Sequence, residues 1–129
     1  MFHTFDLRIY YEDTDLAGIV YYANYLKFIE RARSEWVRSI GLDQTKLRDE
    51  QGIVFAVRRV EADYHAPAKF DDVVQVQTRL IKETGARIVL GQDVIRGDDV
   101  LFASSVTLIA LSRDGTPARL PADVRQSLS

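Results

Sequence analysis

The chain begins with a segment in which apolar and polar residues alternate. Its apolar positions are Phe5, Leu7, Ile9 and Tyr11, and mostly polar residues stand between them. A repeat of two is typical of a strand that buries one face. The alternation stops at residues 12–18, a largely polar stretch that ends in a glycine and indicates a loop.

Residues 24–41 repeat with a longer period. Apolar side chains recur at helical spacing, at Tyr25, Phe28, Ile29, Ala32, Trp36 and Ile40. This spacing predicts a helix of about five turns, with an apolar stripe wide enough to lie against a sheet. Asn24 is a suitable N-cap, and Gly41 is placed to end the helix. A short second helix is predicted over residues 43–51.

Four more strands are predicted, at residues 54–64, 74–80, 88–94 and 100–111. In the first of them, one parity is occupied by Val54, Ala56, Val60, Ala62 and Tyr64. The last is apolar at both parities, which predicts a central strand buried on both faces. Short turns at 83–85 and 97–99 favour antiparallel pairing. Pro117 and Pro121 indicate an irregular tail.

One helix and one sheet must bury their apolar faces against each other. We therefore predict an α+β fold in which a curved antiparallel sheet wraps around the long helix. The length of 129 residues fits one domain, spanning residues 1–129.

Composition narrows the possible functions. The chain has no cysteine, which excludes disulfides, thiolate zinc sites and cysteine nucleophiles. Neither His3 nor His65 belongs to a ligand motif, so no metal is expected. The net charge of −2 argues against a nucleic-acid partner. Without a long apolar run or a secretory leader, we expect no membrane span and a cytoplasmic location.

The loop before the long helix holds two carboxylates, Asp13 and Asp15. The nearby helix N-terminus offers free amides and partial positive charge, which can stabilise an oxyanion on a substrate carbonyl. A carboxylate that faces such a carbonyl can attack it or activate a water. The competing interpretation is that these residues only cap the helix or form a turn. For Asp13 we expect a role in orienting the loop through backbone hydrogen bonds.

The amino-acid sequence of this loop resembles the signature of the 4-hydroxybenzoyl-CoA thioesterase family. The resemblance is carried by residues 11–22, which read YEDTDLAGIVYY, and it continues through residues 24–33 and 64–72. Together these segments look like the YbgC-type branch of acyl-CoA thioesterases. The likeness covers roughly residues 5–112 of the chain.

The resemblance implies the hot-dog fold, a five-stranded antiparallel sheet around one long helix. Family members form dimers with fused sheets, often stacked into tetramers, so a homodimer or homotetramer is expected, with active sites between protomers. The catalytic aspartate of the family falls on Asp15, and the backbone amide that polarises the carbonyl falls on Tyr22. Gly18 of the signature and Tyr25 among the aromatic residues are assigned to substrate binding.

The chain departs from the branch at one position. Many YbgC-type members have a histidine where this chain has Tyr22. A tyrosine has a reference pKa of about 10, so Tyr22 cannot shuttle protons near neutral pH as readily. The change leaves the backbone amide in place, and only the helper role of the side chain is affected.

The expected function is therefore hydrolysis of an acyl-CoA to a carboxylate and free coenzyme A. No cofactor is implied, because coenzyme A is part of the substrate. Arg58, Arg59 and Lys69 are candidates to meet its phosphates, as is Arg87. Arg58 stands on the otherwise apolar parity of its strand, and a buried charge needs a partner. An acyl carrier protein could replace coenzyme A as the thiol carrier.

Two other functions remain open. A hot-dog dehydratase acts on the same thioesters but usually relies on a histidine, and the loop and helix segment here has none. A non-catalytic protein that binds acyl thioesters as a scaffold would also fit the fold. The presence of Asp15 favours catalysis over this last alternative.

Overall fold

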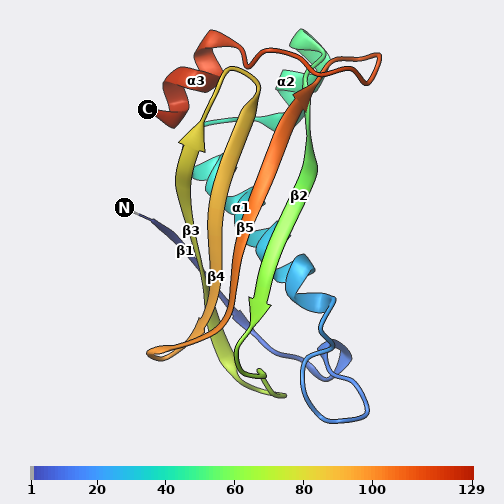
Figure 1. Cartoon of the computed structure of the whole chain (residues 1–129), viewed down its shortest axis with the longest axis vertical. Helices are drawn as coiled ribbons and strands as arrows, with labels where there is room; N and C mark the ends of the chain where they lie inside the picture. The colour runs from blue at the N-terminus through green and yellow to red at the C-terminus, as the bar shows by residue number, and fades with distance from the viewer. Residues whose placement is uncertain (1) are drawn as a thin grey trace.

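The computed structural model describes residues 2–129, which form one antiparallel sheet with a long helix along one face (Figure 1). The strands are β1 (His3–Arg8), β2 (Val54–Tyr64), β3 (Val73–Glu83), β4 (Arg87–Arg96) and β5 (Asp99–Leu111). The helices are α1 (Asn24–Ser39), α2 (Gln44–Gln51) and α3 (Ala122–Leu128), with a 3₁₀ turn η1 at Tyr11–Asp13. The predicted α+β hot-dog arrangement is confirmed.

The strands lie in the order β1-β3-β4-β5-β2, and every neighbouring pair is antiparallel. The two predicted turns join β3 to β4 and β4 to β5. Strand β2 does not pair with β3, its neighbour in sequence, but with β5. Residues 65–72 therefore cross the end of the sheet, next to the loop that precedes α1 (Figure 1).

The core lies between α1 and the inner face of the sheet. Phe28, Ile29 and Ala32 of α1 are buried at 0–1% exposure, as the helical spacing predicted. Strand β5 has neighbours on both sides, but β4 occupies the middle of the sheet. On β5, buried inner residues alternate with half-buried outer ones. The prediction that both faces are buried is therefore correct only for the inner face.

A polar network inside the core ties α1 to the sheet. The Gln92 side chain is fully buried, and its Nε2 donates to the Ile29 carbonyl at 2.8 Å and to Thr78 Oγ1 at 2.9 Å. Its Oε1 accepts from Arg33 Nη1 at 2.9 Å, and burial lowers the pKa of this guanidinium. Buried polar groups are stable only when paired in this way. The network thus fixes how α1 is set on the sheet.

The parity predicted for β2 is correct after its middle but wrong before it, at Val54 and Ala56. The pairing register with β5 shifts between Val57 and Arg59, so Arg58 is an extra residue in a β-bulge. The bulge places Val57 and Val60 on the same face, opposite Leu108 and Val106. The Arg58 side chain is exposed rather than buried, and it needs no partner of the kind the sequence suggested.

The segment before α1 also differs from its prediction. Strand β1 ends at Arg8, and Tyr11 is 81% exposed in the 3₁₀ turn η1 rather than in the strand. Helix α1 includes Asn24, whose side-chain amide donates to the Asp13 carbonyl at 2.9 Å instead of capping the helix. Gly41, at φ +84°, ends the helix as predicted.

The C-terminal tail forms a helix that the sequence did not indicate. In α3, Val124 is fully buried, and just before the helix the Leu120 amide donates to the Gly85 carbonyl at 2.8 Å. The helix closes the end of the core opposite the α1 N-terminus (Figure 1). Among residues 2–129, no helix combines the length and apolarity that crossing a bilayer requires.

Candidate functional site

Residues 13–22, called here the Asp15 loop, fold back on themselves before α1. The Asp15 amide donates to the Ile19 carbonyl at 3.0 Å, and the Gly18 amide donates to the Asp15 carbonyl at 2.9 Å. Thr14 and Val20 form a bridge that closes the loop. Gly18 has φ +81°, a conformation that glycine adopts without strain. The glycine of the signature thus makes the turn that carries Asp15.

The carboxylate of Asp15 is exposed. One of its oxygens accepts from the Ala17 amide at 2.9 Å. Within residues 2–129, no lysine, arginine or histidine forms an ion pair with it. The second oxygen makes no hydrogen bond to any described residue. This oxygen is free to act on a bound molecule.

The Tyr22 backbone lies at the N-terminal end of α1. Its carbonyl accepts a hydrogen bond from the Tyr64 hydroxyl at 2.9 Å. Its amide N–H donates to no acceptor in the part of the chain that the structure describes. The first amides of a helix have no partner inside the helix, and such a donor can stabilise an oxyanion.

A hollow of about 300 Å³ opens beside the loop. It is lined by Ile19, Val20, Tyr22, Tyr25, Tyr64, His65, Ala66 and Pro67. The rings of Tyr22 and Tyr25 each meet the Tyr64 ring edge-on, with centroids 6.2 and 5.5 Å away. Asp15 does not line the hollow itself, and it is joined to the wall through its hydrogen bond with Ile19.

The tyrosines near the hollow are suited to act as neutral hydrogen-bonding groups. Burial raises the pKa of Tyr64 and of Tyr25, and the neighbouring Tyr22 raises the pKa of Tyr21. All three phenols therefore stay protonated at neutral pH. The Tyr25 hydroxyl already accepts from the Ala68 amide at 3.0 Å, so this residue contributes mainly its ring.

Most of the predicted site residues meet at this end of the sheet. Asp15, Gly18, Tyr22 and Tyr25 lie on the loop or in the first turn of α1, and Lys69 forms a backbone bridge with Ile19. The acid, the amide donor and the Lys69 backbone therefore lie at the same end of the sheet.

The two predicted arginines do not join them within a single chain. Arg58 and Arg59 precede Tyr64 on β2 by six and five residues, which is roughly 15 to 20 Å along a strand. Arg59 is paired with Glu61 at 2.7 Å. Their part in binding phosphates stays a prediction.

The sequence analysis missed an ion pair beside the loop. Arg96 Nη1 donates to Asp72 Oδ2 at 2.8 Å, across residues that are 24 positions apart. Asp72 belongs to the segment that resembles the family, but nothing in the sequence points to Arg96. The pair can be found only from the way β3 and β4 align.

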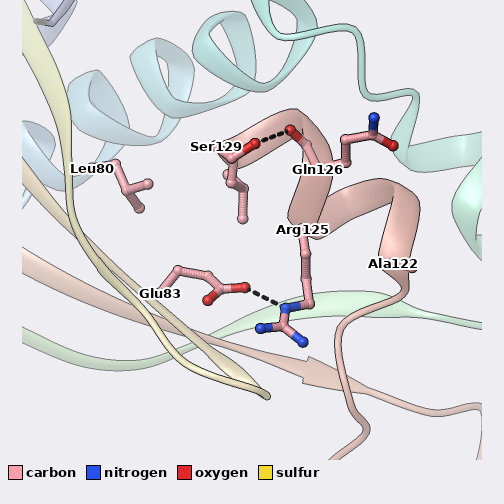
Figure 2. A pocket seen from close by; sticks show the side chains of 7 residues that line it. Leu80, Glu83, Ala122, Arg125, Gln126 and Ser129 are labelled. Atoms are coloured by element: carbon pink, nitrogen blue, oxygen red, sulfur yellow. Dashed lines mark hydrogen bonds and ion pairs between the residues drawn. The ribbon is translucent and has the colours of Figure 1, made fainter.

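A second hollow lies at the opposite end of the sheet, between β3 and α3 (Figure 2). It measures about 550 Å³ and includes Leu80, Glu83, Ala122 and Arg125 in its wall. Its carboxylate is already neutralised, because Arg125 Nε donates to Glu83 Oε1 at 2.8 Å. The Glu83 carboxylate at this hollow is therefore paired, whereas that of Asp15 is not.

Comparison with known proteins shows the family to which the chain belongs. The model of the family described as "Thioesterase superfamily" matches residues 17–103. The acyl-CoA thioesterase YbgC of Haemophilus influenzae is 37% identical over 123 residues, covering 95% of this chain and 90% of the relative. An acyl-CoA thioester hydrolase YbgC of Escherichia coli is 37% identical over 103 residues, covering 80% of this chain and 76% of the relative.

Solved structures show the same likeness. A probable thioesterase from Bartonella henselae superposes with a TM-score of 0.89 at 37% identity, over 94% of this chain and 100% of the other. A mutant 4-hydroxybenzoyl-CoA thioesterase complexed with 4-hydroxybenzoyl-CoA superposes with a TM-score of 0.93 at 25% identity, over 99% of both chains. The chain therefore belongs to the thioesterase superfamily and is a hot-dog protein of the YbgC type.

Proposed function

We propose that the chain hydrolyses the thioester bond of an acyl-CoA, with Asp15 as the catalytic carboxylate and the Tyr22 amide as the donor to the carbonyl oxygen. One observation carries this proposal. Among the described residues, the Asp15 loop brings a carboxylate without a cationic partner, a backbone amide without an acceptor and an aromatic hollow to the same end of the sheet. The YbgC relatives are named for the same reaction.

The amide donor is held in place before the substrate arrives. The Tyr64 hydroxyl donates to the Tyr22 carbonyl, and the backbone amide of Asn24 donates to the Tyr21 carbonyl at 2.8 Å. A donor that need not move during the reaction stabilises the developing negative charge on the thioester oxygen more effectively. The Tyr22 position therefore keeps its main role without the histidine found in many YbgC-type proteins.

Asp15 has two ways to complete the reaction. As a general base it takes a proton from a water, whose oxygen then bonds to the carbonyl carbon. As a nucleophile it bonds to that carbon itself, and water later cleaves the resulting anhydride. In both routes the carbon–sulfur bond breaks, the thiolate of coenzyme A leaves and takes a proton, and the acid is released.

The residues beside the loop support coenzyme A as the carrier of the acyl group. Lys69 forms a backbone bridge with Ile19, which supports its assignment as the cation that meets an anionic group of coenzyme A. An acyl carrier protein, which bears its acyl group on a phosphopantetheine thiol, is the alternative carrier. No cofactor takes part in the proposed reaction. The cytoplasm stays the expected location.

The assembly follows from the edge strand β2. This strand has 11 residues and exposes several apolar side chains. Val57 is 47% exposed, Val60 38% and Tyr64 49%. A long apolar edge strand needs a cover, and a second copy of β2 would provide one by extending the sheet. We expect a homodimer, or a homotetramer built from two dimers, which light scattering after gel filtration measures.

Thiol release from a panel of acyl-CoA thioesters tests the proposal. The panel runs from short aliphatic to aromatic and long-chain acyl groups, and compares the native protein with Asp15→Asn. The asparagine keeps an oxygen that can accept from the Ala17 amide, so the loop should stay folded. Turnover by the native protein that is largely lost in the variant supports the proposal.

Other outcomes separate the alternatives. Equal rates in the two proteins would remove Asp15 from the chemistry. Turnover only with thioesters of acyl carrier protein would change the carrier. Binding of acyl-CoA with no turnover of any thioester would favour a scaffold, and hydration of crotonyl-CoA would favour a dehydratase.

A further inference from the structure

A short turn, residues 67–72, lies between the Asp15 loop and the sheet. The Ala68 carbonyl accepts from the Val20 amide at 2.9 Å, and Lys69 forms a bridge with Ile19. The Ala68 amide donates to the Tyr25 hydroxyl at 3.0 Å. The turn therefore contacts both the loop that carries Asp15 and the first turn of α1.

One carboxylate oxygen joins this turn to the sheet, in addition to the backbone bond from the Asp72 amide to the Lys69 carbonyl at 3.1 Å. Asp72 Oδ2 accepts from the Lys69 amide at 2.8 Å and from Arg96 Nη1 at 2.8 Å. The same Arg96 nitrogen also donates to the Pro67 carbonyl at 3.2 Å. Arg96 is the last residue of β4, so it anchors both ends of the turn to the sheet.

The ion pair is partly shielded and stays charged. The side chains of Arg96 and Asp72 are 35% and 25% exposed. Burial alone would raise the pKa of Asp72, but the hydrogen bonds from Lys69 and Arg96 and the charge of Arg96 lower it overall. The carboxylate is therefore ionised at neutral pH, where the charge-assisted bonds are strongest.

A continuous path of backbone contacts leads from the turn to Asp15. Ala68 and Lys69 hold Val20 and Ile19, and the Ile19 carbonyl in turn accepts from the Asp15 amide at 3.0 Å. A shift of about 1 Å in a reacting group costs on the order of a hundredfold in rate. A displacement of this turn would therefore displace the Asp15 carboxylate through only a few hydrogen bonds.

We propose that Asp72 and Arg96 are positioning residues, whose ion pair holds the 67–72 turn so that Ile19 and Val20 set Asp15 against the Tyr22 amide. Neither residue touches the substrate. The inference rests on the proposed function, since it assigns these residues to the geometry of the same reaction.

The adjacent residue offers a matched control. Asp71 pairs with Arg8 Nη1 at 3.0 Å, but the two side chains are 66% and 53% exposed. Their bond joins the turn to the end of β1 and makes no contact with the Asp15 loop. Asp71 has φ +72°, a conformation that asparagine tolerates, so Asp71→Asn removes the charge without strain.

The test compares kcat and KM in Asp72→Asn and Asp71→Asn. In Asp72→Asn, kcat should fall at least about tenfold with KM within about threefold, because binding groups stay and the carboxylate is misplaced. Asp71→Asn should leave both constants within about twofold. Arg96→Met should reproduce the loss, and Arg96→Lys, which restores a charged donor, should recover most of it.

A second readout needs no substrate. The Val20 amide is hydrogen-bonded to the Ala68 carbonyl. Its hydrogen exchange should become faster in Asp72→Asn and Arg96→Met but not in Asp71→Asn. Native kcat in a folded Asp72→Asn with unchanged Val20 exchange would overturn the proposal. If Asp72→Asn does not fold, the two Arg96 variants decide, and equal kcat in both would overturn it. An inactive native protein would contradict the proposed function alone, because the exchange measurement still tests the clamp.

Discussion

Strand β3 has an acid–arginine pair at each of its ends. At its start Asp72 is paired with Arg96 at 2.8 Å, and at its last residue Glu83 is paired with Arg125 at the same distance (Figure 2). A hollow lies beside each pair, of about 300 Å³ near the Asp15 loop and about 550 Å³ near α3. By size alone, the α3 end would be the better candidate for a binding site.

The two ends differ in the groups that are left without partners. At the α3 end the carboxylate of Glu83 is neutralised by Arg125. At the other end the Asp72 pair leaves Asp15 unneutralised, and the Tyr22 amide has no acceptor among residues 2–129. Available charge and hydrogen-bonding capacity, rather than volume, distinguish the proposed site from the α3 end.

Among the variants that leave Asp15 unchanged, the largest effect should follow from removing the amide donor. Tyr22→Pro deletes this N–H at a position before α1 begins, where proline is tolerated. We expect kcat to fall about 10² to 10³-fold, the usual loss for one oxyanion donor. Tyr22→Phe keeps the amide and serves as the control, with kcat within about threefold. Similar losses in both variants would assign the role to the phenol instead.

Loss of the support behind that amide should have a smaller effect. Tyr64→Phe removes the hydroxyl that donates to the Tyr22 carbonyl and leaves the ring in place. One such bond contributes about 0.5 to 1.5 kcal/mol, so kcat should fall up to about tenfold. Tyr10→Phe changes an exposed tyrosine outside the hollow and should have no effect. An unchanged kcat in Tyr64→Phe would show that the helix end is rigid without this bond.

The Asp72 pair should also show in the pH dependence of stability. The pKa of Asp72 is lowered in the folded chain, so its contribution is complete above its unfolded pKa, about 3.9. The contribution is lost as the pH falls through the lower folded value. We expect Asp72→Asn to reduce the free energy of unfolding by about 1 to 2 kcal/mol at pH 7. Urea denaturation should show this difference shrink below about pH 4, and a constant difference would contradict the assignment.

The smallest effect is expected at the α3 end. Arg125→Met breaks a pair in which the arginine side chain is 43% exposed, which should cost at most about 1 kcal/mol of stability. Thiol release should be unchanged, because nothing at this end contacts the Asp15 loop. A clear loss of kcat in a folded Arg125→Met would mean that the two ends are coupled.

The parts of the fold that periodicity describes could be predicted from the sequence. The α1 stripe and the alternation in β3 and β4 follow directly from burial on one face. The bulge at Arg58 could not be foreseen, because Arg58 and Arg59 are both polar and one extra residue inverts the parity after it. Helix α3 has only 7 residues and forms through its contacts with the core.

The residues of the candidate site also divide into those that the sequence could predict and those that it could not. Asp15, Gly18 and Tyr22 lie within eight positions of one another, so a local motif could identify them together. Asp72 and Arg96 meet only because β3 and β4 align, and that register is set by the folded sheet. The groups proposed to react were thus visible in the sequence, whereas those proposed to position them were not.

The central claim is that the Asp15 end of the sheet is the active site and the α3 end is not. Its most direct test is kcat/KM for thiol release by Asp15→Asn and Glu83→Gln, measured beside the native protein with its best acyl-CoA substrate. We predict a loss of about 10² to 10⁴-fold for Asp15→Asn and a value within about twofold of native for Glu83→Gln. Native activity in Asp15→Asn, or an equal loss in both variants, would contradict the account.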